Sequence, residues 1–456
     1  MSETLCSVGL DVGTTSTQLI VSELTVQNSA GAFSVPEMTI SDRNILYESP
    51  VYLTPLLGED RIDGQGIRQI VEREYDRAGI TRQKVQTGAV IITGETSRKE
   101  NAQAVLSALS DYAGDFVVAT AGPDLESRLA AQGAGAAAYS EKTGKTVLHM
   151  DIGGGTSNLA LIENGVILDT GCLNVGGRLV KYSEDGRILW VSRVLDGMFS
   201  LQPGQTLREE QAEKLAGMLT EVLEMAVGLR PPDERLAKLI TKEGKLLNRE
   251  LLQSRPVLSF SGGVADCIER IHPWKQVGDL GPLLGKAIRN SRLCQGEYLL
   301  GKNPIRATVI GAGCHAAQLS GSTVFYQNIR FPLKNIRVIL LPPVEKVSEA
   351  QIRESLQGKE EPAVLAVGGS RDAGYDVIRT WAEKIARGAG THPLLICLQQ
   401  DMAKALGQAL ALRMGAGAEI LCMDRIVMGE DSYLDVGEPV GPAIPVVVKT
   451  LILGKG

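Results

Sequence analysis

Two glycine-rich segments, each led by an aspartate, constrain the fold of this chain more than any other feature. One runs from Gly9 to Thr17 and the other from Met150 to Asn158. In each, an apolar run ends in an aspartate, a glycine turn with hydroxyl residues follows, and a second apolar run leads out. Glycine permits turns in which successive backbone N–H groups point at an anion, and hydroxyls donate further hydrogen bonds. The pattern predicts two β-hairpins whose tips hold phosphate, with carboxylates placed to orient Mg²⁺ through its water shell.

Composition and charge narrow the class of protein. The 456 residues favour about two to four domains, and the 44% hydrophobic content suffices for well-packed cores. The net charge is −6 and the sequence has no dense stripe of lysine or arginine, which argues against a nucleic-acid partner. No apolar run approaches the ~18 residues of a membrane helix, and the first residues lack a signal-peptide pattern. We therefore expect a cytoplasmic protein without a membrane partner.

The spacing of the cysteines and histidines argues against a metal site and against a catalytic nucleophile. The seven cysteines contain no Cys-x-x-Cys pair, which argues against a disulfide framework and against a zinc or iron–sulfur site. Several lie in apolar runs, where cysteine is a small buried hydrophobe. The four histidines are also dispersed. His149, close before Asp151, is predicted to fill a strand rather than to act in catalysis.

Residues 1–144 combine the first hairpin with alternating strands and helices, the pattern of an α/β fold. Helices are predicted over 66–78 and 101–109, and strands over 88–93 and 116–119. The small residues at 134–138 predict a helix that packs closely against a neighbour.

Residues 145–330 form a second copy of this plan, opened by the strand before Asp151. A long helix is predicted over 207–227, and prolines after it end the helical pattern. A strand, a glycine turn and a helix start are predicted over 256–266, and a second small-residue helix over 308–316.

The pattern changes beyond residue 330. Strands are predicted over 336–341, 363–367, 394–398 and 419–423, separated by helices over 348–356, 375–387 and 402–413. The run 444–453 predicts a strand near a sheet edge. We expect residues 331–456 to form a smaller α/β unit without a phosphate turn.

The order of these features resembles the ATPase superfamily of actin, the heat-shock chaperones and the sugar kinases. Residues 11–15 resemble its first phosphate motif, 151–156 its second, and 261–264 its adenosine motif. The small-residue helices at 134–138 and 311–316 resemble the crossing helices that hinge its two lobes. Because five features in a fixed order are far more specific than one, the resemblance implies duplicated actin-like, ribonuclease H-like lobes around a nucleotide cleft.

This resemblance implies a role for each residue of the turns. Asp11 and Asp151 would hold Mg²⁺ through water, and Asp151 would also orient the attacking water. The phosphates and the adenosine of ATP would be contacted by Gly13, Thr14 and Thr15 from one side, Gly153, Gly154, Gly155 and Thr156 from the other, and Gly262 and Gly263 at the nucleoside. Positioning and charge neutralisation supply most of phosphoryl-transfer catalysis.

Members of the superfamily also carry a Glu or Gln at the first hinge helix, which helps to position water. Glu126 and Gln132 precede the helix expected at 134–138, and neither aligns with it. The sequence therefore predicts slow hydrolysis that serves as a timer.

Three further segments, 92–102, 121–127 and 431–441, resemble the EutA family of ethanolamine ammonia-lyase reactivating factors. The similarity runs the full length and includes the third unit. It implies an ATP-dependent chaperone that binds the adenosylcobalamin enzyme ethanolamine ammonia-lyase and releases damaged cobalamin, so that intact cofactor rebinds. The implied cofactors are ATP and Mg²⁺ and the implied partner is the lyase. Association with a bacterial microcompartment and a homodimer are left open.

Two other functions fit parts of the pattern. Sugar kinases share the segment Gly9–Thr15, but a small-molecule kinase needs a catalytic base near a substrate hydroxyl, and the sequence offers no convincing one. An actin-like filament protein is the second alternative. For the third unit, contact with the partner and a scaffold for the ATPase are equally supported.

Overall fold

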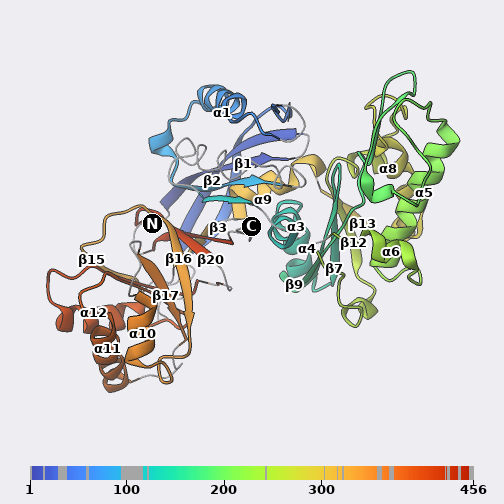
Figure 1. The fold of residues 1–456 in the computed structure, drawn as a ribbon. Coiled ribbons are helices and arrows are strands. Elements are labelled where there is room, and N and C mark those ends of the chain that lie inside the picture. Colours follow the sequence, from blue (N-terminus) through green and yellow to red (C-terminus); the bar gives the residue numbers. More distant parts are fainter. Residues whose placement is uncertain are drawn as a thin grey trace.

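The computed structural model contains three large β-sheets with helices packed on them (Figure 1). It describes residues 3–13, 16–28, 38–57, 61–93, 117–120, 123–241, 244–301, 303–315, 317–320, 323–356, 362–368, 374–426, 428, 432–439 and 443–450. In these ranges the chain has the predicted α/β architecture.

The first sheet contains the first predicted hairpin. Its strand order is β3-β2-β1-β5-β6, with β1, β2 and β3 antiparallel and with β5 and β6 parallel to β1. The elements are β1 (Glu3–Val12), β2 (Ser16–Asn28), β3 (Met38–Glu48), β4 (Tyr52–Leu53), α1 (Gly64–Ala78), β5 (Thr87–Ile92) and β6 (Val117–Thr120). The predicted helix at 66–78 and both predicted strands are confirmed. The helix predicted over 101–109 lies outside the described residues.

The second sheet repeats this order as β9-β8-β7-β12-β13, with three antiparallel strands followed by two parallel ones. Its strands are β7 (Val147–Ile152), β8 (Ser157–Glu163), β9 (Val166–Leu173), β12 (Val257–Ser261) and β13 (Tyr298–Leu300). A small ribbon of β10 (Val180–Tyr182) and β11 (Ile188–Val191) accompanies it. Because the same order occurs twice, the chain has the duplicated actin-like, ribonuclease H-like plan that its sequence predicted.

An apolar face of α5 (Glu209–Ala226) covers one side of the second sheet. Leu215, Leu219 and Leu223 of this helix are fully buried in the largest core of the molecule, together with β7, β8 and α8 (Gly281–Arg289). Their spacing gives one stripe of a helix. Short helices α6 (Glu234–Leu239) and α7 (Asp266–Glu269) complete this lobe.

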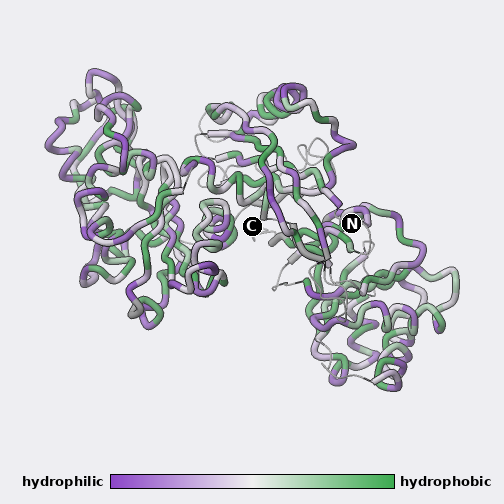
Figure 2. Tube along the Cα trace, turned by 180° about the vertical axis from the view of Figure 1, so that it is seen from behind, coloured by the Kyte–Doolittle hydropathy of each residue, from purple (hydrophilic) through white to green (hydrophobic). Residues whose placement is uncertain are grey.

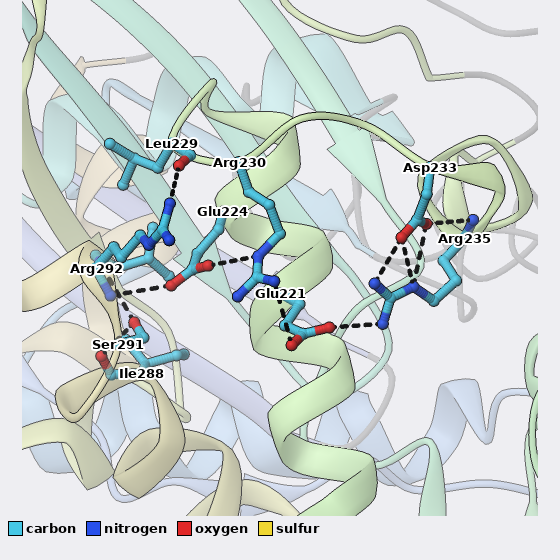
Figure 3. Close-up of polar contacts among 10 residues, drawn as sticks. Glu221, Glu224, Leu229, Arg230, Asp233, Arg235, Ile288, Ser291 and Arg292 are labelled. Carbon is cyan, nitrogen blue, oxygen red and sulfur yellow. Dashed lines mark hydrogen bonds and ion pairs between the residues drawn. The ribbon is translucent and has the colours of Figure 1, made fainter.

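Polar contacts fix the end of α5 (Figure 3). The buried carboxylate of Glu224 accepts hydrogen bonds from the Arg230 guanidinium at 3.0 Å and from the Arg292 backbone N–H at 2.9 Å. Arg235 bridges Glu221 and Asp233 beside it. These contacts tie the end of α5 to the loop before α6 and to the turn at 292–294.

Two helices cross between the lobes, and one of them differs from the prediction. The crossing pair is α3 (Pro123–Gly133) and α9 (Ala307–His315), not a helix at 134–138. Ala134 and Gly135 form a turn, and α4 (Ala136–Thr143) is a separate short helix. The small-residue run led to the wrong position for this helix, because Pro123 and two acids in the first turn mark its actual start.

Glycines allow the crossing helices to approach at backbone distance. A methyl group on Gly133 would lie 1.9 Å from the carbonyl oxygen of Ala307, and one on Gly311 would lie 2.1 Å from that of Leu129. Each helix also packs on the sheet of the other lobe. Helix α3, which follows the first sheet in the chain, packs on the second sheet, and α9, which follows the second sheet, packs on β1 and β2 of the first. The helices therefore link the two lobes, as a hinge requires.

The third sheet has the order β14-β21-β20-β16-β17-β18-β19-β15. Its elements are β14 (Ala317–Leu319), β15 (Phe325–Gln327), β16 (Leu333–Leu341), α10 (Glu349–Leu356), β17 (Ala363–Val367), α11 (Tyr375–Ala389), β18 (Leu394–Leu398), α12 (Ala403–Met414), β19 (Ile420–Asp424), β20 (Ser432–Val436) and β21 (Pro445–Thr450). The predicted strands and helices of this unit are confirmed. Helices α10, α11 and α12 share one apolar core with the sheet, and Figure 2 shows hydrophobic segments along its strands.

The unit boundaries at 144/145 and 330/331 stay predictions. Strand pairing nevertheless places β14 and β15, which precede residue 331, in the third sheet. Strand β21 of that sheet packs against β5 and β6 of the first lobe. In the part of the chain that the model describes, no helix combines the length and the apolar character that a membrane span requires.

A glycine-to-alanine pair tests the helix crossing. Gly311→Ala places a methyl group against backbone atoms, so the helices must move apart, and we expect a loss of about 1–3 kcal/mol and a lower melting temperature. Gly217→Ala in α5 is the matched control, because its methyl group meets open space. We expect the control to gain about 0.5–1 kcal/mol from helix propensity. Thermal unfolding followed by circular dichroism measures both, and a Gly311→Ala protein as stable as the wild type would contradict the close crossing.

Candidate nucleotide-binding site

The two predicted hairpin turns have the same geometry. Asp11 is the next-to-last residue of β1, and the Gly13 N–H donates to the Ser16 carbonyl at 2.9 Å. Asp151 is the next-to-last residue of β7, and the Gly153 N–H donates to the Thr156 carbonyl, also at 2.9 Å. Each lobe therefore ends its central strand in an acid and a closed glycine turn.

Both turns line one cleft of about 370 Å³ between the lobes. The predicted residues found at this cleft are Asp11, Gly13, Asp151, Gly153, Gly154, Gly155, Thr156, Gly262 and Gly263. Thr14 and Thr15 lie outside the described residues. The structure thus brings together residues from both lobes that are far apart in the sequence, and their roles toward a ligand stay predictions.

The two aspartates are buried, and burial disfavours their ionised forms. Asp11 is 9% exposed and accepts a hydrogen bond from the Thr93 hydroxyl at 2.9 Å, while Asp151 is 6% exposed and accepts one from Ser261 at 2.5 Å. Burial and, to a smaller extent, the charge of Asp151 raise the pKa of Asp11 to about 7, although the hydrogen bond from Thr93 opposes this shift. Burial also raises the pKa of Asp151 to about 6, although hydroxyls of Ser261 and Thr308 favour its ionised form. A divalent cation between these carboxylates would offset the cost.

An amide side chain lies opposite each aspartate. In the register of the hairpins, Gln18 lies opposite Asp11, and Asn158 lies opposite Asp151. The side-chain oxygens Oε1 of Gln18 and Oδ1 of Asn158 are buried and accept no hydrogen bond among the described residues. Water molecules around a hydrated cation are suitable donors for such oxygens, so the donor set fits Mg²⁺ held through water.

Three glycines of the cleft serve two different purposes. A methyl group on Gly262, whose φ is +90°, would lie 2.3 Å from the Ile152 carbonyl oxygen, so the backbone there requires glycine. At Gly155 and Gly263 a methyl group would meet nothing within 4 Å and would instead enter the cleft. Space for a ligand is thus kept open next to the backbone N–H groups.

Arg178 supplies a cation that the sequence analysis did not identify. Arg178 lines the cleft, its guanidinium pairs with Asp279 at 3.0 Å, and its aliphatic carbons lie beside Gly154. The Arg178 backbone N–H donates to the Gly154 carbonyl at 2.6 Å, which braces the turn. The signal was the segment Gly176-Gly177-Arg178 after β9, whose pairing with the turn depends on tertiary structure.

Glu126 is a second functional candidate, which the sequence analysis set aside because it precedes the run at 134–138. Because α3 begins at Pro123, Glu126 belongs to the crossing helix and lines the cleft with both aspartates. The prediction that neither Glu126 nor Gln132 aligns with the first hinge helix is therefore wrong, because both lie within α3. A carboxylate at this place can accept a proton from, or orient, a water molecule.

His149 fills a strand, as expected, but it is also part of a polar network. It is fully buried in β7, and its ring nitrogens contact the hydroxyls of Ser259 and Ser261 at 3.0 and 2.9 Å. Burial lowers the pKa of His149 to about 3, so the ring is neutral.

The repeated sheet order, the crossing helices and the cleft define a protein of the actin-like ATPase fold class. The model of the ethanolamine utilisation protein EutA family matches residues 3–454. The chain therefore belongs to this family. Two relatives named ethanolamine ammonia-lyase reactivase EutA, from Salmonella typhimurium and Escherichia coli, are each 36% identical, and the alignments cover 98% of this chain and 98% of each relative.

A solved structure of the Ppx/GppA phosphatase of Aquifex aeolicus is also similar. It is 13% identical, with 68% of this chain and 99% of that chain covered, and its TM-score is 0.39. This superposition is loose, so the fold assignment depends on the repeated strand order within the chain itself.

Neutralising either buried aspartate should stabilise the free protein and abolish its response to ligand. The folded-state pKa values of Asp11 and Asp151 lie above the unfolded value of 3.8, so ionisation costs folding free energy as the pH rises through them. We expect Asp11→Asn and Asp151→Asn to gain on the order of 2–4 kcal/mol at pH 7.5 and little near pH 4. Calorimetry should also show that Mg-ATP raises the melting temperature of the wild type but of neither variant.

Asp185→Asn is the control for this experiment. Asp185 is not among the residues that line the cleft, and the Ser183 hydroxyl lowers its pKa. This variant should gain no stability and should keep the response to Mg-ATP. Stabilisation of all three proteins by Mg-ATP would contradict the assignment of the cleft.

Proposed function

We propose that this protein is an ATP-dependent reactivase of ethanolamine ammonia-lyase. The single observation that carries the proposal is full-length membership of a family whose curated relatives bear that name, at 36% identity over 98% of both chains. The cleft supports it, because both lobes contribute an aspartate and a glycine turn to one space. The reactivase would exchange damaged cobalamin in the lyase for intact adenosylcobalamin.

Residues of both lobes bind the nucleotide in this proposal. The Gly13 and Gly153 N–H groups close their own turns, so the N–H groups that follow them, Gly154 and Gly155 among them, donate to phosphate oxygens. Gly262 and Gly263 let the nucleoside approach the backbone. Thr14 and Thr15 belong to the first turn and are proposed to contact the phosphates as well. Arg178 adds positive charge beside the second turn.

Asp11 and Asp151 are the proposed holders of Mg²⁺, which would neutralise phosphate charge when bound. Asp151, kept in place by Ser261 and Thr308, also orients the attacking water. Glu126 faces the same cleft from α3 and is suited to accept a proton from that water. These groups are sufficient for slow hydrolysis.

Lobe closure connects the nucleotide to the partner. The lobes meet through α3 and α9, so a nucleotide held by both turns favours a closed arrangement. A partner bound to both lobes is affected only if the open and closed states bind it with different affinity. Contact of the third sheet with the lyase, a cytoplasmic location, association with a microcompartment and a homodimer stay predictions. A small-molecule kinase is not favoured, since the relatives over the whole chain are reactivases.

Recovery of an inactivated lyase tests this function. Ethanolamine ammonia-lyase is first blocked with a cobalamin that lacks the adenosyl group, and then receives this protein, Mg-ATP and free adenosylcobalamin. We expect ammonia release to resume only with hydrolysable ATP. Asp151→Asn should give no recovery, and Asp185→Asn should match the wild type.

Two outcomes would contradict the proposal. Recovery that is equal without nucleotide would remove the role of ATP. A phosphorylated metabolite formed from labelled ATP and cell extract, without lyase recovery, would favour the kinase.

A further inference from the structure

Four polar side chains form a square on one face of the second sheet. His149 and Asp151 lie two residues apart on β7, and Ser259 and Ser261 lie two residues apart on β12. The parallel register pairs His149 with Ser259 and Asp151 with Ser261. Because side chains alternate along a strand, all four point to the same side. That side faces α3 and α4, since the intervening Leu148 and Met150 pack in the opposite core.

The hydrogen bonds within this square have one consistent direction. The Asp151 carboxylate is an acceptor, so the single Ser261 hydroxyl hydrogen points to it, at 2.5 Å. The Ser261 oxygen must then accept from His149 Nε2–H, at 2.9 Å. His149 Nδ1 is left as an acceptor for the Ser259 hydroxyl, at 3.0 Å. The tautomer with hydrogen on Nε2 follows from the donors and acceptors present.

The first lobe lacks this extension. Its aspartate, Asp11, is held by the Thr93 hydroxyl alone among its side-chain hydrogen bonds in the described residues. Two residues before Asp11 is Gly9, where α9 packs against the strand. His149 occupies the corresponding place in the second lobe. A buried imidazole with two buried hydroxyls is costlier there than an apolar side chain, unless the network is satisfied.

We infer that His149 is a positioning residue for Asp151, acting through the Ser261 hydroxyl. This inference rests on the proposed function, in which Asp151 orients the attacking water and Mg²⁺. The Nε2–H group donates to the Ser261 oxygen, so the Ser261 hydroxyl keeps donating its own hydrogen bond to the Asp151 carboxylate. This hydrogen bond fixes the orientation of the carboxylate. Groups that support ligands of a metal site in this way typically change activity by about 10–100-fold when removed.

Two amide substitutions distinguish the contribution of Nε2 of His149 from that of Nδ1. In His149→Gln the side-chain NH₂ reaches the place of Nε2 and can donate to Ser261. In His149→Asn the shorter amide reaches only the place of Nδ1, beside Ser259. We expect His149→Gln to keep kcat for ATP hydrolysis within about threefold of wild type, and His149→Asn to lose about tenfold or more, with KM for ATP changed little in both. Ser261→Ala should resemble His149→Asn.

Nitrogen NMR of ¹⁵N-histidine-labelled protein tests the hydrogen-bond direction without nucleotide. Of the four histidines, the resonances lost in His149→Gln belong to His149, and they should show the Nε2–H tautomer. An Nδ1–H tautomer or an imidazolium would overturn the inference, as would equal kcat in the Gln and Asn variants when both remain folded. Absence of hydrolysis and of reactivation by the wild type would overturn the proposed function instead, and the tautomer would still decide whether the directed network exists.

Discussion

Two buried carboxylates that share one cleft impose the main physical constraint on this structure. Asp11 and Asp151 are almost removed from water, and the charge of Asp151 further disfavours ionisation of Asp11. Hydroxyls of Thr93, Ser261 and Thr308 offset only part of this cost. In the proposed function a cation-bound triphosphate would offset the rest and contact both lobes, so that relief of the electrostatic cost and closure of the lobes would become one event.

Helix α9 connects that event to the rest of the molecule. It packs on the first sheet at Gly9, crosses α3 at Gly311, and carries Thr308 to Asp151 of the second lobe. Contacts between backbones at these distances leave little room for local adjustment. A movement of one lobe would therefore shift these helices as rigid units rather than deform them. The third sheet follows the first lobe, because β21 packs against β5 and β6. A change at the cleft therefore reaches the surfaces available to a partner through few, stiff contacts.

The sequence predicted features that local patterns determine, and it failed where tertiary contacts decide. Both hairpin turns were predictable, because glycine, aspartate and hydroxyl residues specify them within nine residues. Apolar runs located most strands of the third unit. The crossing helix was misplaced because the run at 134–138 outweighed the helix start at Pro123, and Glu126 was therefore set aside. The contacts of Thr308, Arg178 and the serines around His149 could not be predicted locally, since they depend on neighbours more than 100 residues away or on turn pairing.

A crystal structure with Mg²⁺ and a non-hydrolysable ATP analogue tests the central claim most directly. The account predicts that the β- and γ-phosphates lie between the turns at Gly13 and at 153–155, with the metal-bound water molecules on Asp11 and Asp151 and the nucleoside beside Gly262 and Gly263. The account would be contradicted if the two turns lay apart and held no phosphate. It would also be contradicted if the nucleotide bound elsewhere, such as in the cavity beside the third sheet that Arg330 and His392 line.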